Sequence, residues 1–418
     1  MALTDCSVYA SVPAVPMAST LPESADAVVV GGGTIGAWCA YFLKRSGLDR
    51  VVLVEKDQLG QGASSRAAGI VRSQGGTRWA VELAEWSRTF YRSQHDEIGI
   101  DSGFTQQGYF LPCFTPDDLV AAEARMQMQR AAGLDVRWLD PDEADRVNPT
   151  MAPGMTLGGT YFDGDGYITP PRNVLAYAVA MAQAGVDVHE HTAFTGLATD
   201  AGTVTGVETS AGPIATDRVV LTGGPKLRAV GALAGIRIPV GGVRHQVAVT
   251  EPHPDFEPSR LPMVFDLVAG LYWRAEERGL LFGMSNPDEP EGKATEIDLP
   301  YLDRMRGRLA ELVPVTEKLA LRRAWAATID FTPDHLPILG PGITADGPIG
   351  GVTVAAPGGH GMMWGPGVAR AAADLALTGT TSVTDCTDLG LDRFDAEGRS
   401  KLPADPIALP FPERTAST

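Results

Sequence analysis

The residues of this chain whose types and spacing could do chemistry are a glycine run at 31–36 and a later acidic residue, Glu55. The run reads Gly-Gly-Gly-Thr-Ile-Gly, so Gly31, Gly33 and Gly36 occupy the three glycine positions of G-x-G-x-x-G. A turn without side chains lets its backbone approach a pyrophosphate closely, and a carboxylate about twenty residues later can accept hydrogen bonds from a ribose hydroxyl. The spacing therefore predicts that the chain binds a dinucleotide.

Two apolar strands and a helix must position these groups. Residues 27–30 and 51–54 are wholly apolar, which is typical of strands buried on both faces of a parallel sheet. A helix over about 35–45 would join them and present its free N–H groups and positive dipole end to the phosphates. The alternative is a glycine-rich turn in another α/β fold, but the strand, helix and closing acid together favour the dinucleotide site.

Composition limits the classes of partner. The chain has 418 residues, enough for two domains, and a formal net charge of −17 that argues against nucleic acid or an anionic membrane as partner. No apolar run is long enough to span a bilayer, and residues 1–24 lack the features of a signal peptide. The cysteines Cys6, Cys39, Cys113 and Cys386 are widely separated, which predicts free thiols in the cytoplasm and no metal site.

Three blocks carry a family resemblance. Residues 62–72 read G-A-S-S-x-x-x-G-I-x-R, residues 332–340 read T-P-D-x-x-P-I-x-G, and residues 359–362 read G-H-G-M near an expected helix start. An apolar strand at 218–222 also runs into two glycines. This pattern resembles the FAD-dependent amine and amino-acid oxidoreductases of the D-amino-acid oxidase superfamily, which includes glycine oxidase and sarcosine oxidase relatives, and it covers most of residues 26–380.

The resemblance implies FAD as a non-covalent cofactor. The residues that it implies for binding FAD are Gly31, Gly33, Thr34, Ile35, Gly36, Glu55, Lys56, Ala63, Ser64, Ser65, Gly69, Ile70, Phe194, Thr222, Gly223, Gly224, Gly359, His360, Gly361, Met362 and Met363.

The resemblance also implies a substrate site. Arg72 falls where sarcosine oxidase relatives bind the substrate carboxylate, and an arginine fork suits that role because it binds both oxygens. A salt bridge between domains is its alternative role. Tyr272 and Arg274, on a strand of the expected cavity floor, are further candidates, although an aromatic residue on a strand is more often packing. His360 could act in the chemistry or only hydrogen-bond the backbone.

Several positions depart from the family. Ala327 stands where monomeric sarcosine oxidases attach the flavin through cysteine, and Met363, Leu281 and Ile329 replace basic residues of relatives. Carboxylate binding would therefore rest on Arg72. A cavity lined by Met362, Met363, Trp273 and Trp364 would be unusually apolar, which predicts an amine or N-substituted amino acid with an apolar part.

We therefore expect an α/β fold with a Rossmann-type FAD-binding domain and a second, mixed domain of antiparallel sheet and helices. The expected FAD-binding domain comprises 26–100, 151–235 and 332–395, the substrate domain comprises 101–150 and 236–331, and 1–25 and 396–418 are extensions. The expected reaction is oxidation of a C–N bond to an imine, with O2 reduced to H2O2. The alternatives are a dehydrogenase that uses a quinone or electron-transfer protein, and a non-catalytic flavin-binding assembly subunit. An oligomer is possible.

Overall fold

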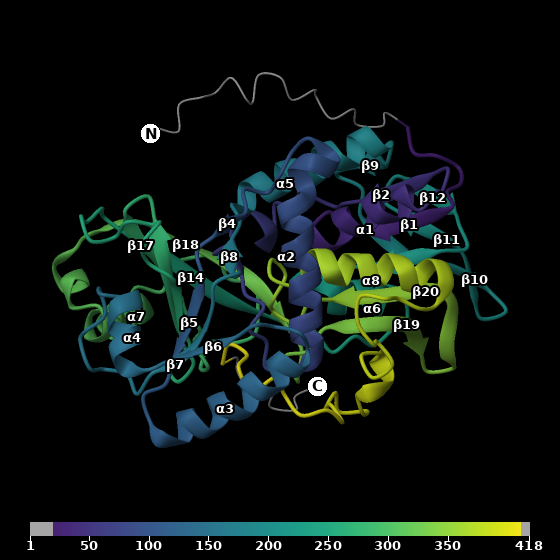
Figure 1. Cartoon of the computed structure of the whole chain (residues 1–418). Coiled ribbons are helices and arrows are strands. Elements are labelled where there is room, and N and C mark those ends of the chain that lie inside the picture. The colour runs from purple at the N-terminus through teal and green to yellow at the C-terminus, as the bar shows by residue number, and fades with distance from the viewer. Residues whose placement is uncertain (1–19, 411–418) are drawn as a thin grey trace.

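The computed structural model describes residues 20–410 and contains two large sheets and one small sheet. In Figure 1 the first large sheet lies on the right and the second on the left, with the long helix α2 (Arg78–Ile98) between them. Thr77 caps this helix by accepting a hydrogen bond from the N–H of Ala80, and Gly99 ends it in a left-handed conformation.

The first sheet holds the predicted dinucleotide strands. Strands β1, β2 and β13 pair in parallel, with Val29 opposite both Leu53 and Val220. The order across the sheet is β10 (Phe194–Asp200), β11 (Thr203–Thr209), β20 (Gly347–Ala356), β13 (Val219–Leu221), β1 (Ala27–Val30), β2 (Val51–Val54) and β9 (Asp187–His189), with β12 (Gly212–Ala215) on β11 and β19 (Ile338–Thr344) on β20.

Helices cover both faces of the first sheet. One face shares a hydrophobic core with α1 (Thr34–Arg45), α5 (Pro170–Ala184) and α8 (Gly365–Thr378). The other face packs against residues around the short helix α6 (Leu227–Leu233). Because both faces are covered, β1 and β2 are completely apolar, as the sequence pattern predicts.

The second sheet is mainly antiparallel, and helices α7 (Leu299–Leu312) and α4 (Pro141–Val147) share its core on one face. Helix α3 (Pro116–Ala131) lies beside it (Figure 1). Its strands in order are β18 (Leu321–Phe331), β14 (Gly241–Thr250), β17 (Gly279–Met284), β16 (Leu271–Glu276), β15 (Met263–Asp266), β5 (Tyr109–Pro112), β7 (Gly159–Phe162) and β6 (Arg137–Leu139). The small sheet joins β3 (Ile70–Val71), β8 (Gly166–Tyr167) and β4 (Thr105–Gln106).

The predicted fold class is confirmed, and some local expectations need correction. Strand β4 pairs with β8, whereas β5 pairs with β7 and β15. Strand β7 belongs to the second sheet, so we propose moving 159–162 from the FAD-binding domain to the substrate domain. The segment after residue 396 is not merely a surface extension, since Asp405 and Ile407 are buried.

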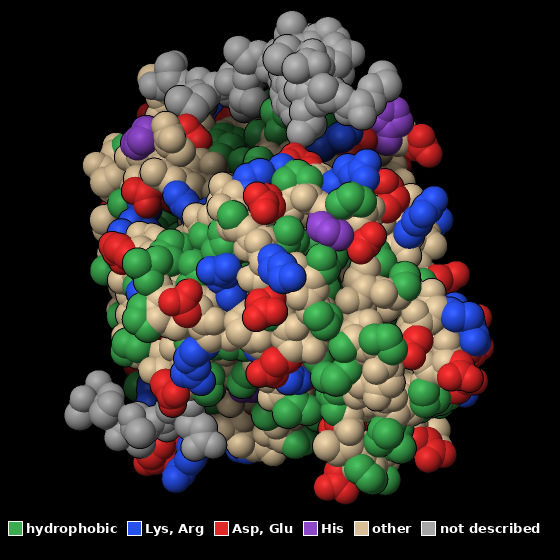
Figure 2. Space-filling model, turned by 90° about the vertical axis from the view of Figure 1, so that its left-hand side faces the viewer, with side chains coloured by type: hydrophobic (Ala, Val, Ile, Leu, Met, Phe, Trp, Pro, Cys, Tyr) green, Lys and Arg blue, Asp and Glu red, His purple; other side chains and the backbone are tan. Residues whose placement is uncertain are grey.

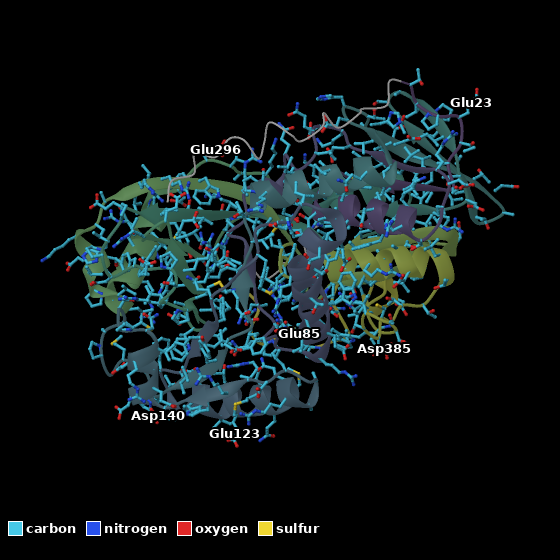
Figure 3. All side chains as sticks on the ribbon, turned by 45° about the horizontal axis from the view of Figure 1, so that its top comes forward. Glu23, Glu85, Glu123, Asp140, Glu296 and Asp385 are labelled. Carbon is cyan, nitrogen blue, oxygen red and sulfur yellow. The ribbon has the colours of Figure 1, made fainter. Side chains whose placement is uncertain are left out.

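The surface carries both signs of charge. Figure 2 shows acidic and basic side chains interspersed on one face, and the acidic residues Glu23, Glu123 and Asp140 lie at the margin in Figure 3. Within residues 20–410, no helix has both the length and the apolar character needed to cross a membrane. The same residues include no cluster of three or more His, Cys, Asp or Glu side chains that could hold a metal ion. The prediction for residues 1–24 lies mostly outside the described residues.

Candidate active site

A cavity of about 960 Å³ contains most of the predicted functional residues. Its walls come from the glycine turn after β1, from the segment 54–72, and from β14, β15, β16 and β18 of the second sheet. It therefore extends from the dinucleotide strands to the antiparallel sheet, so one molecule could be held by both parts of the fold.

Glu55 is positioned by backbone groups at one end of the cavity. Its carboxylate accepts hydrogen bonds from the N–H of Gly32 at 2.7 Å and from the N–H of Asp57 at 2.8 Å. These bonds fix the side chain beside the glycine turn, and each oxygen keeps a further lone pair. The geometry suits a carboxylate that accepts hydrogen bonds from ribose hydroxyls.

The glycine turn is shaped by close approaches that side chains would prevent. A Cβ atom on Gly36 would lie 1.9 Å from the carbonyl oxygen of Gly31, and Gly31 itself has a φ of +104°. Gly33 differs, because its Cβ would meet only the hydroxyl of Ser64 at 3.2 Å. Gly33 is also the N-cap of α1 and offers no side-chain acceptor, so the first turn of the helix keeps N–H groups for an anion. The turn therefore fits a pyrophosphate.

The structure brings almost all the predicted cofactor residues together. Every one of them except Ser65 lines the cavity, including the distant Phe194, Thr222 and His360. Ser65 ends the short turn 63–65, while Ser64 accepts a hydrogen bond from the N–H of Thr34 at 3.0 Å. Of the two serines, Ser64 is thus the one that shapes the cavity.

Arg72 is a buried cation for which residues 20–410 provide no ion-pair partner. Its side chain is 3% exposed and lines the cavity, and its Nε and Nη1 atoms have no hydrogen-bond partner among residues 20–410. Its guanidinium carbon lies 5.2 Å from the ring centre of Phe265 and 5.9 Å from that of Tyr109. No salt bridge between domains involves Arg72 in the described part of the chain. A buried guanidinium with free donors suits a carboxylate ligand.

Tyr272 lines the cavity and is paired with a residue that the sequence analysis did not single out. Its hydroxyl lies 2.7 Å from Nε2 of His245, which also lines the cavity. Burial lowers the pKa of His245 to about 4, so the imidazole is neutral near pH 7. His245 lines the cavity from β14. The sequence alone does not reveal this, because it depends on the register of β14 in the sheet.

Arg274 is not placed at the cavity. Its Nε and Nη2 atoms both donate to the carbonyl oxygen of Ala68 at 3.2 Å, and its guanidinium carbon stacks 4.0 Å from the ring centre of Tyr167. It also forms an ion pair with Glu276. These contacts satisfy the side chain within the protein, so the structure favours a structural role for Arg274.

His360 lies in a turn before α8 rather than at the helix start, because α8 begins at Gly365. Its Nδ1 lies 3.2 Å from the carbonyl oxygen of Gly358, and its ring stacks on Trp364 at 4.1 Å. Burial, reinforced by the positive charge of Arg72, lowers the pKa of His360 to about 3. His360 is therefore a neutral cavity wall with a backbone contact.

The apolar lining differs from the predicted one. Met362 and Met363 line the cavity, whereas Trp364 and Trp273 are buried in the hydrophobic cores of the first and second sheets. The cavity is lined from the second sheet and the C-terminal segment by side chains that include Tyr109, Phe265, Ala327, Ile329 and Leu409. Leu281 is buried on β17 and does not line the cavity.

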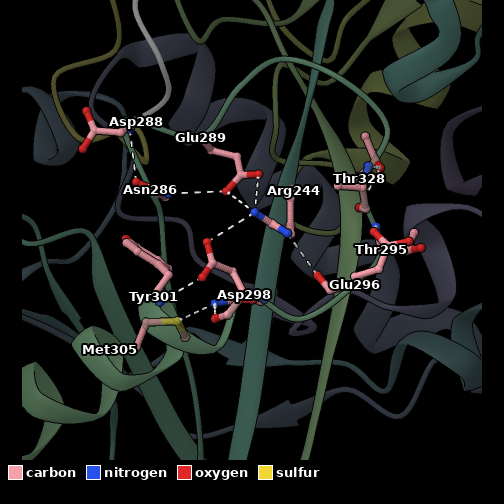
Figure 4. A network of polar contacts seen from close by, with 12 residues as sticks. Arg244, Asn286, Asp288, Glu289, Thr295, Glu296, Asp298, Tyr301, Met305 and Thr328 are labelled. Carbon is pink, nitrogen blue, oxygen red and sulfur yellow. Dashed lines mark hydrogen bonds and ion pairs between the residues drawn. The ribbon is translucent and has the colours of Figure 1, made fainter.

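A polar network holds one cavity wall in place. Residues 286–298 form a loop whose members Gly292 and Thr295 line the cavity. Arg244 on β14 forms ion pairs with Glu289 at 2.9 Å and Asp298 at 3.3 Å, as Figure 4 shows. The network thus ties the loop to β14, the strand that also carries His245.

Asp165 is a buried carboxyl group close behind Arg72. One oxygen accepts a hydrogen bond from the N–H of Ser73 at 2.6 Å, while the other has no hydrogen-bond partner within residues 20–410. Burial raises the pKa of Asp165 to about 7, and the attraction of Arg72 opposes that shift. The folded protein therefore keeps this proton up to about pH 7, whereas an exposed aspartate loses it near pH 4.

This difference predicts a pH-dependent stability. The favourable contribution of the protonated carboxyl is complete below about pH 4 and is lost as the pH rises towards 7. The substitution Asp165→Asn keeps a neutral acceptor for Ser73, so it should stabilise the protein more at pH 8 than at pH 4, by on the order of 2–4 kcal/mol. Thermal melts of both proteins at the two pH values measure this. A difference in Tm that does not change with pH would contradict the assignment.

The fold and the cavity define the class of protein: a Rossmann-type dinucleotide-binding protein whose cavity extends to a second, mainly antiparallel sheet. Comparison with known proteins identifies the family within this class. Residues 26–375 match the family model described as FAD dependent oxidoreductase, DAO, and the chain belongs to that family, with FAD as its cofactor.

The similarities extend over most of the chain. It is 28% identical to 4-methylaminobutanoate oxidase (formaldehyde-forming) of Paenarthrobacter nicotinovorans, over 96% of this chain and 49% of that protein. It is 30% identical to human mitochondrial sarcosine dehydrogenase, over 77% of this chain and 36% of that protein. The crystal structure of glycine oxidase from Geobacillus kaustophilus is similar with a TM-score of 0.77 and 26% identity, covering 90% of this chain and all of the other. The chain thus spans less than half the length of these two curated relatives.

Proposed function

We propose that the protein oxidises the C–N bond of a secondary amine that carries a carboxylate and an apolar part, such as an N-substituted glycine. FAD supplies the acceptor for the hydride that leaves the carbon next to the nitrogen. Loss of that hydride and of the amine proton gives an imine, which water hydrolyses. Molecular oxygen is proposed as the final acceptor and would be reduced to hydrogen peroxide.

The observation that carries this proposal is that Nε and Nη1 of the Arg72 guanidinium find no hydrogen-bond partner in the described part of the chain. A buried arginine with two unpartnered N–H positions is costly unless a ligand completes its hydrogen bonds. A carboxylate does this best, since its two oxygens match the guanidinium fork. Phe265 and Tyr109 border the same charge and would contact the apolar part of the ligand.

Tyr272 and His245 are proposed to act on the amine. The amine must be neutral before hydride loss, so its proton is released to solvent beforehand, and the neutral imidazole and the tyrosine hydroxyl that it contacts are proposed to hydrogen-bond the neutral amine. His360 is proposed to form a wall of the cavity. In this scheme Arg72 binds the substrate carboxylate, while the tyrosine–histidine pair orients the amine.

The electron acceptor has an alternative. Leu281 stands where oxygen-using relatives resembling this chain carry lysine, and one relative is named a dehydrogenase. A quinone or an electron-transfer protein therefore remains the second candidate acceptor. A non-catalytic assembly role is less well supported, because the chain retains both Arg72 and the glycine turn at the cavity.

Steady-state assays test the proposed substrate class. Peroxide formation and reduction of an artificial dye should both be measured with glycine, sarcosine and N-alkyl glycines of increasing size. We expect higher kcat/KM for the bulkier N-alkyl glycines than for sarcosine or glycine. Faster turnover of sarcosine or glycine would contradict the apolar preference, and dye reduction without peroxide would favour the dehydrogenase.

FAD is proposed to be held without a covalent bond. The described cysteines Cys39, Cys113 and Cys386 are free thiols, and none of them lines the cavity. Acid precipitation of the purified protein should therefore release all of the yellow cofactor into the supernatant. Colour that remains with the precipitated chain, seen as a fluorescent band on a denaturing gel, would show a covalent link.

A further inference from the structure

The C-terminal part of the described chain lies against the candidate active site. In Figure 1 the yellow C-terminal stretch runs from below α8 towards the second sheet. Leu409 lines the cavity and packs on a cluster that includes Phe265 and Tyr272. We propose that residues 405–410, the C-terminal strap, form one wall of the substrate chamber, and that Leu409 sets the size of the apolar group a substrate can carry.

The strap is anchored through Asp334, which lies shortly before β19 of the first sheet. The N–H of Asp405 donates to the carbonyl oxygen of Asp334 at 3.0 Å. The carboxylate of Asp334 is itself held by Arg393 at 2.7 Å and by the hydroxyl of Ser400 at 2.6 Å. Arg393 and Ser400 thus hold the side chain of Asp334, and the backbone of the same residue holds Asp405, the first residue of the strap.

A tight turn then directs Leu409 towards the cavity. Asp405 is 5% exposed, and its Oδ1 accepts a hydrogen bond from the N–H of Ile407 at 3.0 Å. Its carbonyl oxygen accepts a second bond from the N–H of Ala408 at 3.2 Å. Ile407 is 2% exposed, so the turn is held by packing as well as by hydrogen bonds.

Two glycines elsewhere in the chain make room for the strap. A Cβ atom on Gly76 would lie 1.9 Å from Oδ1 of Asp405, and one on Gly270 would lie 2.7 Å from Cδ of Pro410. Any side chain at either position would displace the strap. The strap therefore has a defined path across both halves of the molecule.

The position of Leu409 gives it a part in specificity, provided that the proposed function is correct. Leu409 packs against the cluster that contains Phe265, and the ring of Phe265 lies 5.2 Å from the guanidinium carbon of Arg72. A substrate whose carboxylate binds Arg72 would therefore bring its apolar substituent close to Leu409. Changes of one methylene in an apolar pocket alter kcat/KM by roughly 10- to 200-fold.

Substitutions at Leu409 test the inference with a matched control. We expect Leu409→Ala to raise the ratio of kcat/KM for N-benzylglycine over sarcosine about tenfold, and Leu409→Phe to lower it by a similar factor. Leu402→Ala makes the same change in the same tail away from the cavity, and should leave the ratio at the wild-type value. Ratios for both Leu409 variants equal to wild type would overturn the proposal.

Measuring the binding of carboxylates, which needs no turnover, tests the role of Leu409 independently of the proposed function. If wild-type protein oxidises none of the amines, the proposed function fails, and the same variants are titrated with acetate, isovalerate and phenylacetate. The change in flavin absorbance gives each Kd. We expect Leu409→Ala to favour phenylacetate over acetate by about tenfold more than wild type. An unchanged preference would overturn the role of the strap, and Leu409→Met replaces the alanine variant if that protein does not fold.

Discussion

Replacing Arg72 by methionine is expected to lower kcat/KM for the carboxylate-bearing amine by roughly 10²- to 10³-fold. Removing one partner of a buried, hydrogen-bonded charge pair costs about 2–5 kcal/mol, and each 1.4 kcal/mol is about tenfold. The folded protein should tolerate the change, because residues 20–410 provide no ion-pair partner for the buried Arg72 and methionine has a similar apolar length. The kcat/KM of Arg72→Lys should lie between those of the wild type and Arg72→Met, because lysine keeps the positive charge but lacks the guanidinium fork.

Two comparisons make this result specific. An amine without a carboxylate, such as N-methylbenzylamine, should react no more slowly with Arg72→Met than with wild type. Arg125 is also a buried arginine with an unpartnered Nε, but it does not line the cavity, so Arg125→Met should keep kcat/KM close to wild type. Equal losses for both amines would mean that Arg72 does not bind the carboxylate.

Replacing Gly33 by alanine is expected to weaken FAD binding about 10- to 100-fold without unfolding the protein. Gly33 has a φ of −82°, which alanine adopts readily, and its Cβ would meet only the Ser64 hydroxyl. The added methyl group would instead occupy the space into which the pyrophosphate must fit. Overpacking of this kind costs about 1–3 kcal/mol. Isothermal titration of the apoprotein with FAD gives the Kd.

Two other glycines separate cofactor binding from folding. Gly36→Ala should lower the Tm of the apoprotein as well as its affinity for FAD, because its Cβ would lie 1.9 Å from the Gly31 carbonyl oxygen. Gly307→Ala on α7 has nothing within 4 Å and should change neither property for the worse. FAD affinity of Gly33→Ala equal to that of Gly307→Ala would exclude the proposed pyrophosphate site.

The dinucleotide half of the fold could be predicted because its signals are local. β1 and β2 are apolar on both faces and are bounded by glycine or by charge, so their limits agree with the sequence pattern. The cofactor positions outside the glycine turn follow from the family resemblance, and almost all of the predicted positions line the cavity.

The substrate half depends on long-range register, which one sequence does not reveal. Tyr272 and Arg274 share a face of β16, yet they lie roughly 7 Å apart along the strand. Only Tyr272 lines the cavity, because the side chain of Arg274 donates to the carbonyl oxygen of Ala68 and stacks on the ring of Tyr167. His245 and Leu409 were missed for the same reason, because β14 and the C-terminal strap meet the cavity only through tertiary packing.

The central claim is that this cavity holds FAD next to an amine bound by Arg72, and an anaerobic titration tests it most directly. The visible spectrum of the purified protein is recorded without oxygen while N-alkyl glycines are added. We predict that the oxidised-flavin bands bleach with the wild-type protein and persist with Arg72→Met at the same concentrations. A protein that contains FAD but is bleached by no amine, or equally in both variants, would contradict the account.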